Sequence, residues 1–380
     1  MPEVCQLSTL PFVDPQLAGT GWNYRPVPAS DPRPLPVTDR PLALDIDVVG
    51  AGRTMSLAEF HAATASTSLL VLVDGVLLHE WYRDGLGPGT RFLGASATKS
   101  VLCHLVGGAV RTGALGLDDL VEQHVPELVG TGYARVPVRH LLTMTSGVDW
   151  VEDHRDPSGP ASALVAAFLA GASSRAVLAE VGRRCAPGTR YEYCTADSQV
   201  LDWVRERASG VPFLPAVARL WSDLGCTADA EVAVDGDGVA LAGGGLAATA
   251  RDWARIGLLQ LDGCADDGTR LLDCEWVRDA SRPTLPFLRP GRLPSVLSTH
   301  VGFGYHWWPL DARGDRVSAD GSRGQFVYLD RPRSAVVVKT SEWAFADPLH
   351  DRQRRDLSYL ALGTIAEAAR LSALEKEVLH

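Results

Sequence analysis

The sequence predicts a mixed α/β fold in which strands from both ends of the chain form one domain and a helical region is inserted between them. Three observations lead to this prediction. Apolar runs typical of strands occur at residues 69–82 and again at 325–340. Between them, most apolar residues recur at helical spacing. Residues 352–374 have the same spacing, so a helix is expected to close the chain.

The first predicted element is a β-hairpin. Residues 69–73 and 76–82 are apolar runs separated by Asp74-Gly75, a dipeptide that favours a two-residue turn. Later strands are expected at residues 303–308, 325–329 and 335–340, with a turn-like sequence at 330–333 joining the last two. We expect these strands and the hairpin to belong to the same domain.

The predicted helices fill the middle of the chain. One should begin near Ser96, because apolar residues between 101 and 110 mark a buried stripe. Others are expected at residues 138–143, 161–170, 197–208 and 249–260. Thr249 and Asp252 resemble a capping box at the start of the last one.

This order of elements predicts the domain organisation. Residues 1–42 are rich in proline and lack periodicity, so they are expected to form an extended arm over the surface. Residues 43–115 together with 290–380 should form the α/β domain. Residues 116–289 should form the mainly helical domain.

Composition excludes several classes of function. The chain has 380 residues and a formal net charge of -10, which argues against nucleic-acid binding. Neither its seven cysteines nor its ten histidines show a metal-binding spacing, so no metal or organic cofactor is expected. The N-terminus lacks the pattern of a signal peptide, and no apolar stretch approaches the roughly 18 residues of a spanning helix. We therefore expect a cytoplasmic protein without a membrane partner; its oligomeric state stays open.

The first candidate for chemistry is Ser96-Ala97-Thr98-Lys99. Residues three apart on a helix share one face, and a serine at a helix start lies beside unpaired backbone N–H groups. A neutral lysine one turn on can take the hydroxyl proton of such a serine. The chain has only three lysines, so one in this position is informative. Taken alone, the pattern also fits a helix-capping serine followed by an exposed lysine.

Two further segments could complete a site. Tyr193 precedes a predicted helix and could relay a proton, although a core tyrosine with a satisfied hydroxyl fits the same pattern. Residues 321–325, Gly-Ser-Arg-Gly-Gln, lead into a late strand and would allow a substrate to approach the backbone closely. Asp149, Glu152 and Asp153 could meet an amine, but a solvated loop is the favoured interpretation.

Together these segments resemble a known superfamily. A hairpin, Ser-x-x-Lys at a helix start, a helical insert carrying Tyr193, and a glycine-rich entry to a late strand occur in this order in serine β-lactamases and penicillin-binding proteins. The sequence motifs are most similar to those of class C-like esterases, and to the 6-aminohexanoate-dimer hydrolase group among them. The segments that carry this similarity are VRHLLTMTSG at 138–147, PG at 187–188, ASG at 208–210, GGGL at 243–246, ARDWAR at 250–255 and GFGYHWW at 302–308.

The resemblance implies a β-lactamase/transpeptidase-like fold, an antiparallel sheet flanked by helices, with a Ser-Lys-Tyr site. Ser96 would attack a carbonyl, Lys99 would take its proton, and Tyr193 would protonate the leaving group. The N–H groups of Ser96 and Gln325 would form the oxyanion hole of a covalent acyl-enzyme. The remaining candidates for substrate binding are Thr195, Ser322, Arg323, Gly324, Trp150, Tyr305 and Trp307.

Two departures from the superfamily pattern affect the substrate. Thr195 stands where an asparagine is usual, and Ser322-Arg323-Gly324 replaces the usual Lys-Thr-Gly or His-x-Gly. Lys339-Thr340-Ser341 looks similar but lies inside the following strand. β-Lactam hydrolysis is therefore not the expected activity.

Three functions remain open. The enzyme could hydrolyse a small ester or amide, which is the favoured reading. It could instead pass the acyl group to an amine in natural-product biosynthesis. The scaffold could also be a non-catalytic binding module, although such a module has no need of Ser96, Lys99 and Tyr193 together.

Overall fold

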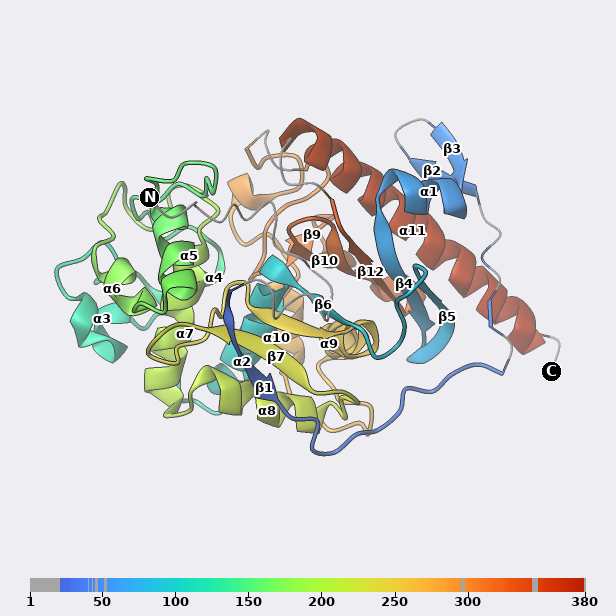
Figure 1. Cartoon of the computed structure of the whole chain (residues 1–380), viewed down its shortest axis with the longest axis horizontal. Helices are drawn as coiled ribbons and strands as arrows, with labels where there is room; N and C mark the ends of the chain where they lie inside the picture. The colour runs from blue at the N-terminus through green and yellow to red at the C-terminus, as the bar shows by residue number, and fades with distance from the viewer. Residues whose placement is uncertain are drawn as a thin grey trace.

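The computed structural model describes residues 21–39, 41–42, 44, 47–50, 53–294, 298–343 and 348–378. A six-stranded antiparallel sheet with the spatial order β5-β4-β12-β11-β10-β9 forms its centre (Figure 1). The strand bounds are β4 Ser66–Val73, β5 Val76–Tyr82, β9 Trp308–Pro309, β10 Arg316–Gly321, β11 Gln325–Asp330 and β12 Ala335–Ser341. The predicted hairpin therefore pairs with strands from the end of the chain, as the α/β prediction requires.

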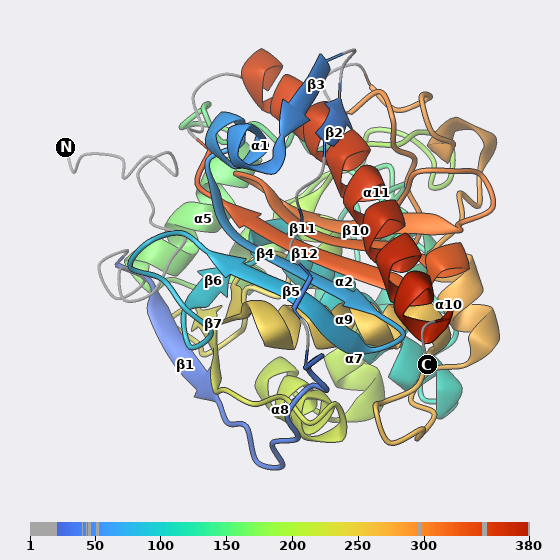
Figure 2. The ribbon, with the colours of Figure 1, turned by 90° about the vertical axis from the view of Figure 1, so that its right-hand side faces the viewer.

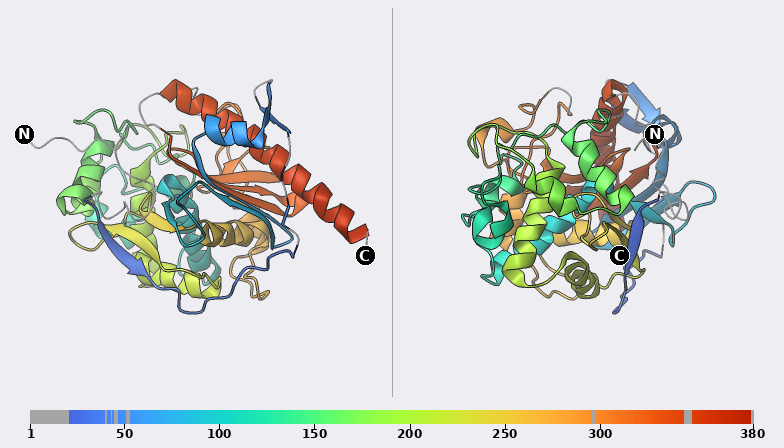
Figure 3. Two further views of the ribbon diagram at one scale, coloured as in Figure 1. Left: turned by 45° about the vertical axis from the view of Figure 1, so that its right-hand side comes forward. Right: turned by 60° about the vertical axis from the view of Figure 1, so that its left-hand side comes forward.

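The helices lie mostly in the middle of the chain and at its C-terminal end, and the right panel of Figure 3 brings the middle ones to the front. A cap of the predicted kind begins α9, where the Thr249 side chain accepts a hydrogen bond from the N–H of Asp252. The helix bounds are α1 Leu57–Ala63, η3 Ala95–Ala97, α2 Thr98–Arg111, α3 Val121–His124, η4 Pro126–Leu128, α4 Val138–Leu142, α5 Pro160–Ala170, α6 Ser174–Ala179, α7 Thr195–Ser209, α8 Phe213–Asp223, α9 Ala250–Asp262, α10 Cys274–Ala280, η5 Pro286–Leu288, η6 Arg331–Arg333 and α11 Pro348–Val378.

The six-stranded sheet is covered by helices on both faces. Successive side chains of a strand point to opposite faces, and β4 follows this rule. Leu70 lies in one apolar core with Ile256 of α9, whereas Leu69 lies in the other core with Leu362 of α11. Figure 2 shows α11 crossing the face turned to the viewer, and the left panel of Figure 3 shows α9 on the opposite side. The sheet is thus the middle layer of three.

A second, four-stranded sheet fixes the position of the α2 start. Its spatial order is β1-β7-β8-β6, and all its pairs are antiparallel. β6 leads directly into η3, and the N–H of Gly94 between them donates to the carbonyl of Leu246 at 2.9 Å. The strand bounds are β1 Asn23–Val27, β6 Arg91–Leu93, β7 Ala230–Val234 and β8 Leu246–Thr249, while β2 Asp47–Gly50 and β3 Arg53–Ser56 form a separate pair.

One predicted strand is wrong in most of its length. Of residues 303–308 only Trp308 lies in a strand, β9. The N–H of Phe303 donates to the carbonyl of Leu288, and the N–H of His306 to that of Leu142, so this backbone bonds with loops and a helix end. His306 has a φ of 55°, which an extended strand does not contain.

The division into three parts stays a prediction. Residues 1–20 lie outside the described residues. β1, from the expected arm, pairs with β7, and the following segment bonds to the body through Arg33 N–H and the Gly225 carbonyl at 3.0 Å. Helix α9, from the expected helical domain, packs on the six-stranded sheet.

Candidate active site

The turn before α2 brings Ser96 and Lys99 together. Gly94 is required there, because a Cβ at this position would lie 2.2 Å from the ring of Trp253. The Lys99 Nζ is 3.0 Å from the Ser96 Oγ, 3.2 Å from the Thr195 Oγ1 and 2.5 Å from the Gly243 carbonyl oxygen. The structure therefore places the two residues of the Ser-x-x-Lys pattern in direct contact.

Burial controls the charge of Lys99. The side chain is only 2% exposed, and desolvation lowers the pKa of its ammonium group to about 8. The negative charge of Glu152 acts in the opposite direction and limits this fall. A lysine with such a pKa is neutral in a useful fraction of molecules near neutral pH, as a general base must be.

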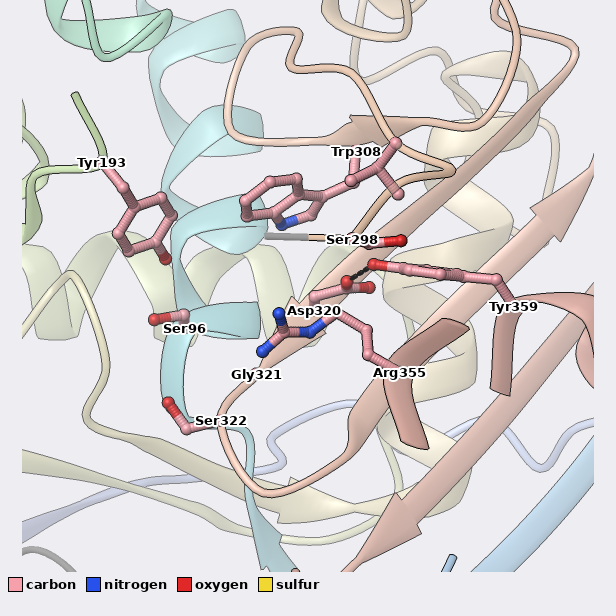
Figure 4. Close-up of a pocket in the computed structure, with 10 residues that line it drawn as sticks. Ser96, Tyr193, Ser298, Trp308, Asp320, Gly321, Ser322, Arg355 and Tyr359 are labelled. Carbon is pink, nitrogen blue, oxygen red and sulfur yellow. Dashed lines mark hydrogen bonds between the residues drawn. The ribbon is translucent and has the colours of Figure 1, made fainter. Parts of the chain in front are cut away.

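Tyr193 lies against both residues. Figure 4 shows its hydroxyl turned toward Ser96, and burial raises the pKa of the phenol well above its ordinary value. The Lys99 Nζ lies 5.2 Å from the centre of the Tyr193 ring, and the Trp308 ring stacks on the same ring at 5.7 Å. Tyr193 is thus a neutral hydroxyl that can give or accept a proton beside Ser96.

Glu152 lies in the site, although the sequence favoured a position in a solvated loop. Its Oε2 accepts hydrogen bonds from the Thr195 N–H at 2.9 Å and the Trp150 Nε1–H at 2.6 Å. Its Oε1 accepts from the Thr195 hydroxyl and lies 3.2 Å from His154 Nε2. These contacts lower the pKa of Glu152 to about 2 despite its burial. The residue pattern gave only a weak signal, an acid shortly after the turn at 146–147.

Thr195 connects this carboxylate with Lys99. Its hydroxyl donates to Glu152 and accepts from the Lys99 Nζ, so the site contains a continuous path from Glu152 through Thr195 and Lys99 to Ser96. The threonine that departs from the superfamily pattern therefore has a defined place in the site.

Two cavities flank Ser96, and Ser96, Tyr193 and Ser322 line both. The first has a volume of about 110 Å³ and is shown in Figure 4. Its other lining residues are Ser298, Val301, Trp308, Asp320, Gly321, Arg355 and Tyr359. The second has a volume of about 170 Å³ and is mainly apolar. Its other lining residues are Trp22, Leu93, Ala95, Glu152, His154, Ala161, Leu164, Val165, Thr195, Leu241, Gly243 and Gly244.

The glycine-rich segment reaches Ser96 through its first two residues. Gly321 at the end of β10 approaches the turn before α2 so closely that a Cβ would lie 2.0 Å from the Gly94 carbonyl oxygen. Among the described residues, neither the Ser96 N–H nor the Ser322 N–H has a backbone acceptor. Gln325 starts β11, and its side-chain amide donates to the Ser341 carbonyl at 2.7 Å. Ser322, unlike Gln325, lines both cavities at Ser96.

Arg323 and Gly324 form the turn of the β10–β11 hairpin. Arg323 Nε donates to the Trp343 carbonyl at 2.8 Å, and a Cβ on Gly324 would lie 2.4 Å from the Trp343 ring. Both residues have positive φ angles, 63° and 89°. Neither lines a cavity at Ser96, so their place in the structure is in the turn.

Three aromatic residues that were predicted to bind substrate lie outside both cavities. Trp150 is fully buried and donates a hydrogen bond to Glu152. Tyr305 packs on Trp276 at 5.4 Å, and Trp307 lies beside His104. None of the three lines either cavity; Trp308 does.

The described residues contain no candidate metal site. Within the described ranges, no group of three or more histidine, cysteine, aspartate or glutamate residues could hold a metal ion. No described helix combines the length and apolar character needed to cross a membrane.

Comparison with known proteins places the chain in a family. The family model described as beta-lactamase matches residues 56–360. The chain belongs to the beta-lactamase family. This membership agrees with the β-lactamase/transpeptidase-like fold and makes the protein a relative of serine hydrolases.

Several relatives refine this placement. The chain is 30% identical over 316 residues to the 6-aminohexanoate-dimer hydrolase of Paenarthrobacter ureafaciens, covering 79% of this chain and 78% of the relative. A candidate 6-aminohexanoate-dimer hydrolase from Bacillus anthracis has a similar structure, with a TM-score of 0.77, 21% identity and coverage of 94% and 95%. EstCE1, a hydrolase with promiscuous acyltransferase activity, gives a TM-score of 0.59 at 18% identity, covering 80% of this chain and 98% of its own. The family resemblance read from the sequence is confirmed, including the 6-aminohexanoate-dimer hydrolase branch.

Proposed function

We propose that this member of the beta-lactamase family is a serine-dependent acyl-transfer enzyme that cleaves an ester or amide through a covalent acyl-Ser96 intermediate. The observation that carries the proposal is the buried Lys99, whose Nζ lies 3.0 Å from the Ser96 Oγ with a pKa lowered to about 8. The 30% identical relative is named 6-aminohexanoate-dimer hydrolase, and this name supports hydrolysis as the overall reaction.

In the proposed acylation step, neutral Lys99 accepts the Ser96 hydroxyl proton while the Oγ attacks the substrate carbonyl carbon. The carbonyl oxygen becomes an oxyanion that accepts hydrogen bonds from two backbone N–H groups. Ser96 supplies one. Gln325 was the sequence-based choice for the other, but the Ser322 N–H is favoured because it lacks a backbone acceptor and Ser322 lines both cavities.

Collapse of the tetrahedral intermediate breaks the bond to the leaving oxygen or nitrogen. Tyr193 donates its hydroxyl proton to that atom and regains a proton through Lys99, which lies against the ring. In deacylation, water attacks the acyl carbon and transfers its proton back along the same path. The products are the free acid and the alcohol or amine, with Ser96 regenerated.

Transfer of the acyl group to an amine is the second candidate reaction. It differs from hydrolysis only in the nucleophile of the last step, so the same residues serve both. The aromatic side chains of Tyr193, Trp308 and Tyr359 around one cavity favour an organic acceptor there. Products formed from an activated ester with and without added primary amines, separated by mass, distinguish amide formation from hydrolysis alone.

The function is tested with a neutral activated ester, such as p-nitrophenyl butyrate. Wild type should release p-nitrophenol, and Ser96→Ala should reduce turnover by at least about 10³-fold with unchanged circular dichroism. Ser158→Ala, an exposed serine that bonds only to Asp156, is the matched control and should retain full activity. Full activity in Ser96→Ala would contradict the proposal, because another residue would then act as the nucleophile. Absence of turnover in folded wild type would instead favour the binding-module alternative.

A further inference from the structure

The neutral form of Lys99, which the proposed chemistry requires, has two N–H groups and one lone pair. Its Nζ contacts three oxygens, those of Ser96, Thr195 and the Gly243 carbonyl. The carbonyl oxygen can only accept a hydrogen bond. The Thr195 hydroxyl gives its own proton to the Glu152 carboxylate, so its oxygen also accepts from Lys99. Both N–H groups are thus engaged, and the lone pair is left facing the Ser96 hydroxyl.

The Gly243 carbonyl belongs to the connection between β7 and β8 and not to a helix or strand, so its position depends on what holds this loop. A single side chain does so. The Gly243 N–H donates to the Oε1 of Gln199 at 2.9 Å, and the Nε2 of Gln199 donates to the Ala240 carbonyl at 3.0 Å. The amide therefore bridges residues 240 and 243, and it uses both its acceptor and its donor to do this.

Gln199 lies on the face of α7 that packs against this loop. It is 4% exposed and follows Thr195 by four residues, so the two side chains share one helix face. The loop lies close to that face, because a Cβ on Gly243 would be 2.9 Å from the Thr195 methyl group and 3.4 Å from the Ser198 Cβ. One turn of α7 thus sets both acceptors of Lys99, Thr195 directly and Gly243 through Gln199.

Nothing in the described backbone replaces this amide. Among the described residues, the Gly243 N–H has no backbone acceptor, so Gln199 satisfies it. Without the amide, a buried N–H and a buried carbonyl would have to find other partners, and the loop would shift to reach them. The Gly243 carbonyl would then leave Lys99, whose amine could rotate away from the orientation that proton transfer needs. A misplacement of about 1 Å in such a geometry can cost about 10²-fold in rate.

We propose that Gln199 is a positioning residue for Lys99: it holds the Gly243 carbonyl against one N–H of the amine, so that the lone pair points at the Ser96 hydroxyl. This role rests on the proposed function and adds a geometric requirement to its acylation step. When the lone pair takes the Ser96 proton, the ammonium group keeps the two hydrogen bonds that the amine already makes, so Lys99 need not reorient. Gln199 lines neither cavity at Ser96 and therefore acts through Gly243, not on the substrate.

The test compares two buried glutamines. Gln199→Met keeps the length of the side chain and removes both polar groups, and Gln199→Ala leaves space for water in case the first variant does not fold. Gln260→Met is the matched control, because this fully buried amide of α9 bonds elsewhere, to His104, Val277 and Ser281. For each protein, kcat and KM for p-nitrophenyl butyrate are measured against pH. Rates are expressed per molecule that a fluorophosphonate labels at Ser96 after long incubation, so an unfolded fraction does not count as a loss.

We expect kcat to fall by roughly 10- to 100-fold in both Gln199 variants, with KM changed by less than about 3-fold. The alkaline limb of kcat/KM should also move to lower pH by about one unit, because the ammonium form of Lys99 loses an acceptor that stabilises it. The other titratable groups that act on Lys99 or lie close to it are unchanged in these variants; they are Glu152, Tyr193, Cys194 and His306. Gln260→Met should keep the wild-type kcat within about 3-fold and the wild-type limb.

The outcomes separate the role of Gln199 from the proposed function. A kcat in the Gln199 variants equal to that of Gln260→Met would overturn the positioning role alone. A fall in kcat without movement of the limb would do the same, since it would indicate a general loss of structure. Wild type that neither hydrolyses the ester nor is labelled at Ser96 would overturn the proposed function and the positioning role together.

Discussion

At the scale of single residues, the proposed mechanism makes activity depend on the protonation of Lys99. Since Lys99 must be neutral to accept the Ser96 proton, kcat/KM for a neutral ester should rise with pH through a limb near the lysine pKa of about 8. Glu152 raises this pKa by its charge, through space and along the hydrogen bonds of Thr195.

Glu152→Gln should move this limb to lower pH. Removing the negative charge leaves desolvation unopposed, so the pKa of Lys99 falls and the neutral form appears earlier. The maximum rate should also fall, because the amide cannot accept from all the present donors. The measurement is kcat/KM against pH for wild type, Glu152→Gln and the control Asp153→Asn, whose carboxylate pairs with Arg155 on the surface. A limb that stays in place in Glu152→Gln would show that Glu152 does not act on Lys99.

Tyr193→Phe should distinguish substrates by their leaving groups. An alkoxide or amide nitrogen needs a proton to leave, so kcat for an alkyl ester or an anilide should fall by about 10²- to 10⁴-fold. p-Nitrophenolate leaves without a proton, and its release should be affected much less. The p-nitrophenyl ester therefore serves as the control substrate for this variant. Equal losses for both classes would move the proton-donor role to another residue.

Within the site, only the contact between residues close in sequence could be predicted. Ser96 and Lys99 lie three residues apart on one helix turn, so their contact follows from helix geometry. Glu152 belongs to a loop without regular spacing, and Arg355 lies about 260 residues after Ser96 in sequence. Their approach to the serine depends on tertiary packing, which spacing along the chain does not reveal.

At the scale of elements, Gly107 allows α2 to pack closely against α10. A Cβ on Gly107 would lie 2.5 Å from Trp276 Nε1 and 2.8 Å from a methyl group of Leu272, whereas a Cβ on Gly108 would meet nothing within 4 Å. The helix that begins at the candidate active site therefore approaches α10 closely at Gly107.

The two neighbouring glycines make a matched pair of variants. Gly107→Ala should destabilise the protein by about 1–3 kcal/mol, because the added methyl group overpacks the contact with α10. Gly108→Ala should be neutral or stabilise by up to about 1 kcal/mol, since alanine favours the helical backbone. Denaturant unfolding of both variants measures the difference. Equal free energies of unfolding would contradict the described packing of α2.

Local pattern also explains which elements were predictable. The β4–β5 hairpin has two mainly apolar runs joined by an Asp-Gly turn, and both strands form as predicted. β10 was not predicted, because Ser318 and Asp320 interrupt its apolar pattern. Asp320 lines the cavity at Ser96. A strand beside the site thus has a sequence that is not typical of a strand.

At the scale of the whole molecule, a buried lysine couples stability to pH. Lys339 in β12 is fully buried, its Nζ bonds to the Ser341 hydroxyl, and three rings lie within 5.6 Å, those of Phe60, Phe326 and Trp343. Desolvation lowers its pKa well below the ordinary value of 10.5, so the folded protein holds a neutral amine where the unfolded chain holds an ammonium group.

Lys339→Met should therefore weaken the pH dependence of stability. Below pH 10.5 the unfolded state binds a proton that the folded state does not, so wild-type stability falls as the pH falls toward the lowered pKa. Methionine cannot bind this proton. We expect the Tm difference between pH 9 and pH 6 to be smaller in Lys339→Met than in wild type. An identical difference in both proteins would contradict a neutral Lys339.

The pairing of distant strands was predictable only in outline. Strand patterns near both ends indicated a shared α/β domain, and β4 does pair with β12. The spatial order of the six strands, and the covering of opposite faces by α9 and α11, depend on packing between segments far apart in sequence. The family resemblance predicted the overall fold, whereas the spacing of apolar residues predicted the separate helices and strands.

Covalent labelling tests the central claim, that Ser96 is an acylated nucleophile, most directly. Wild type, Ser96→Ala and Ser158→Ala are incubated with a fluorophosphonate and with an activated ester, and their intact masses and labelled peptides are measured. We predict one adduct per molecule in wild type and Ser158→Ala, located at Ser96, and none in Ser96→Ala. An adduct at another residue, or equal labelling of folded Ser96→Ala, would contradict the account.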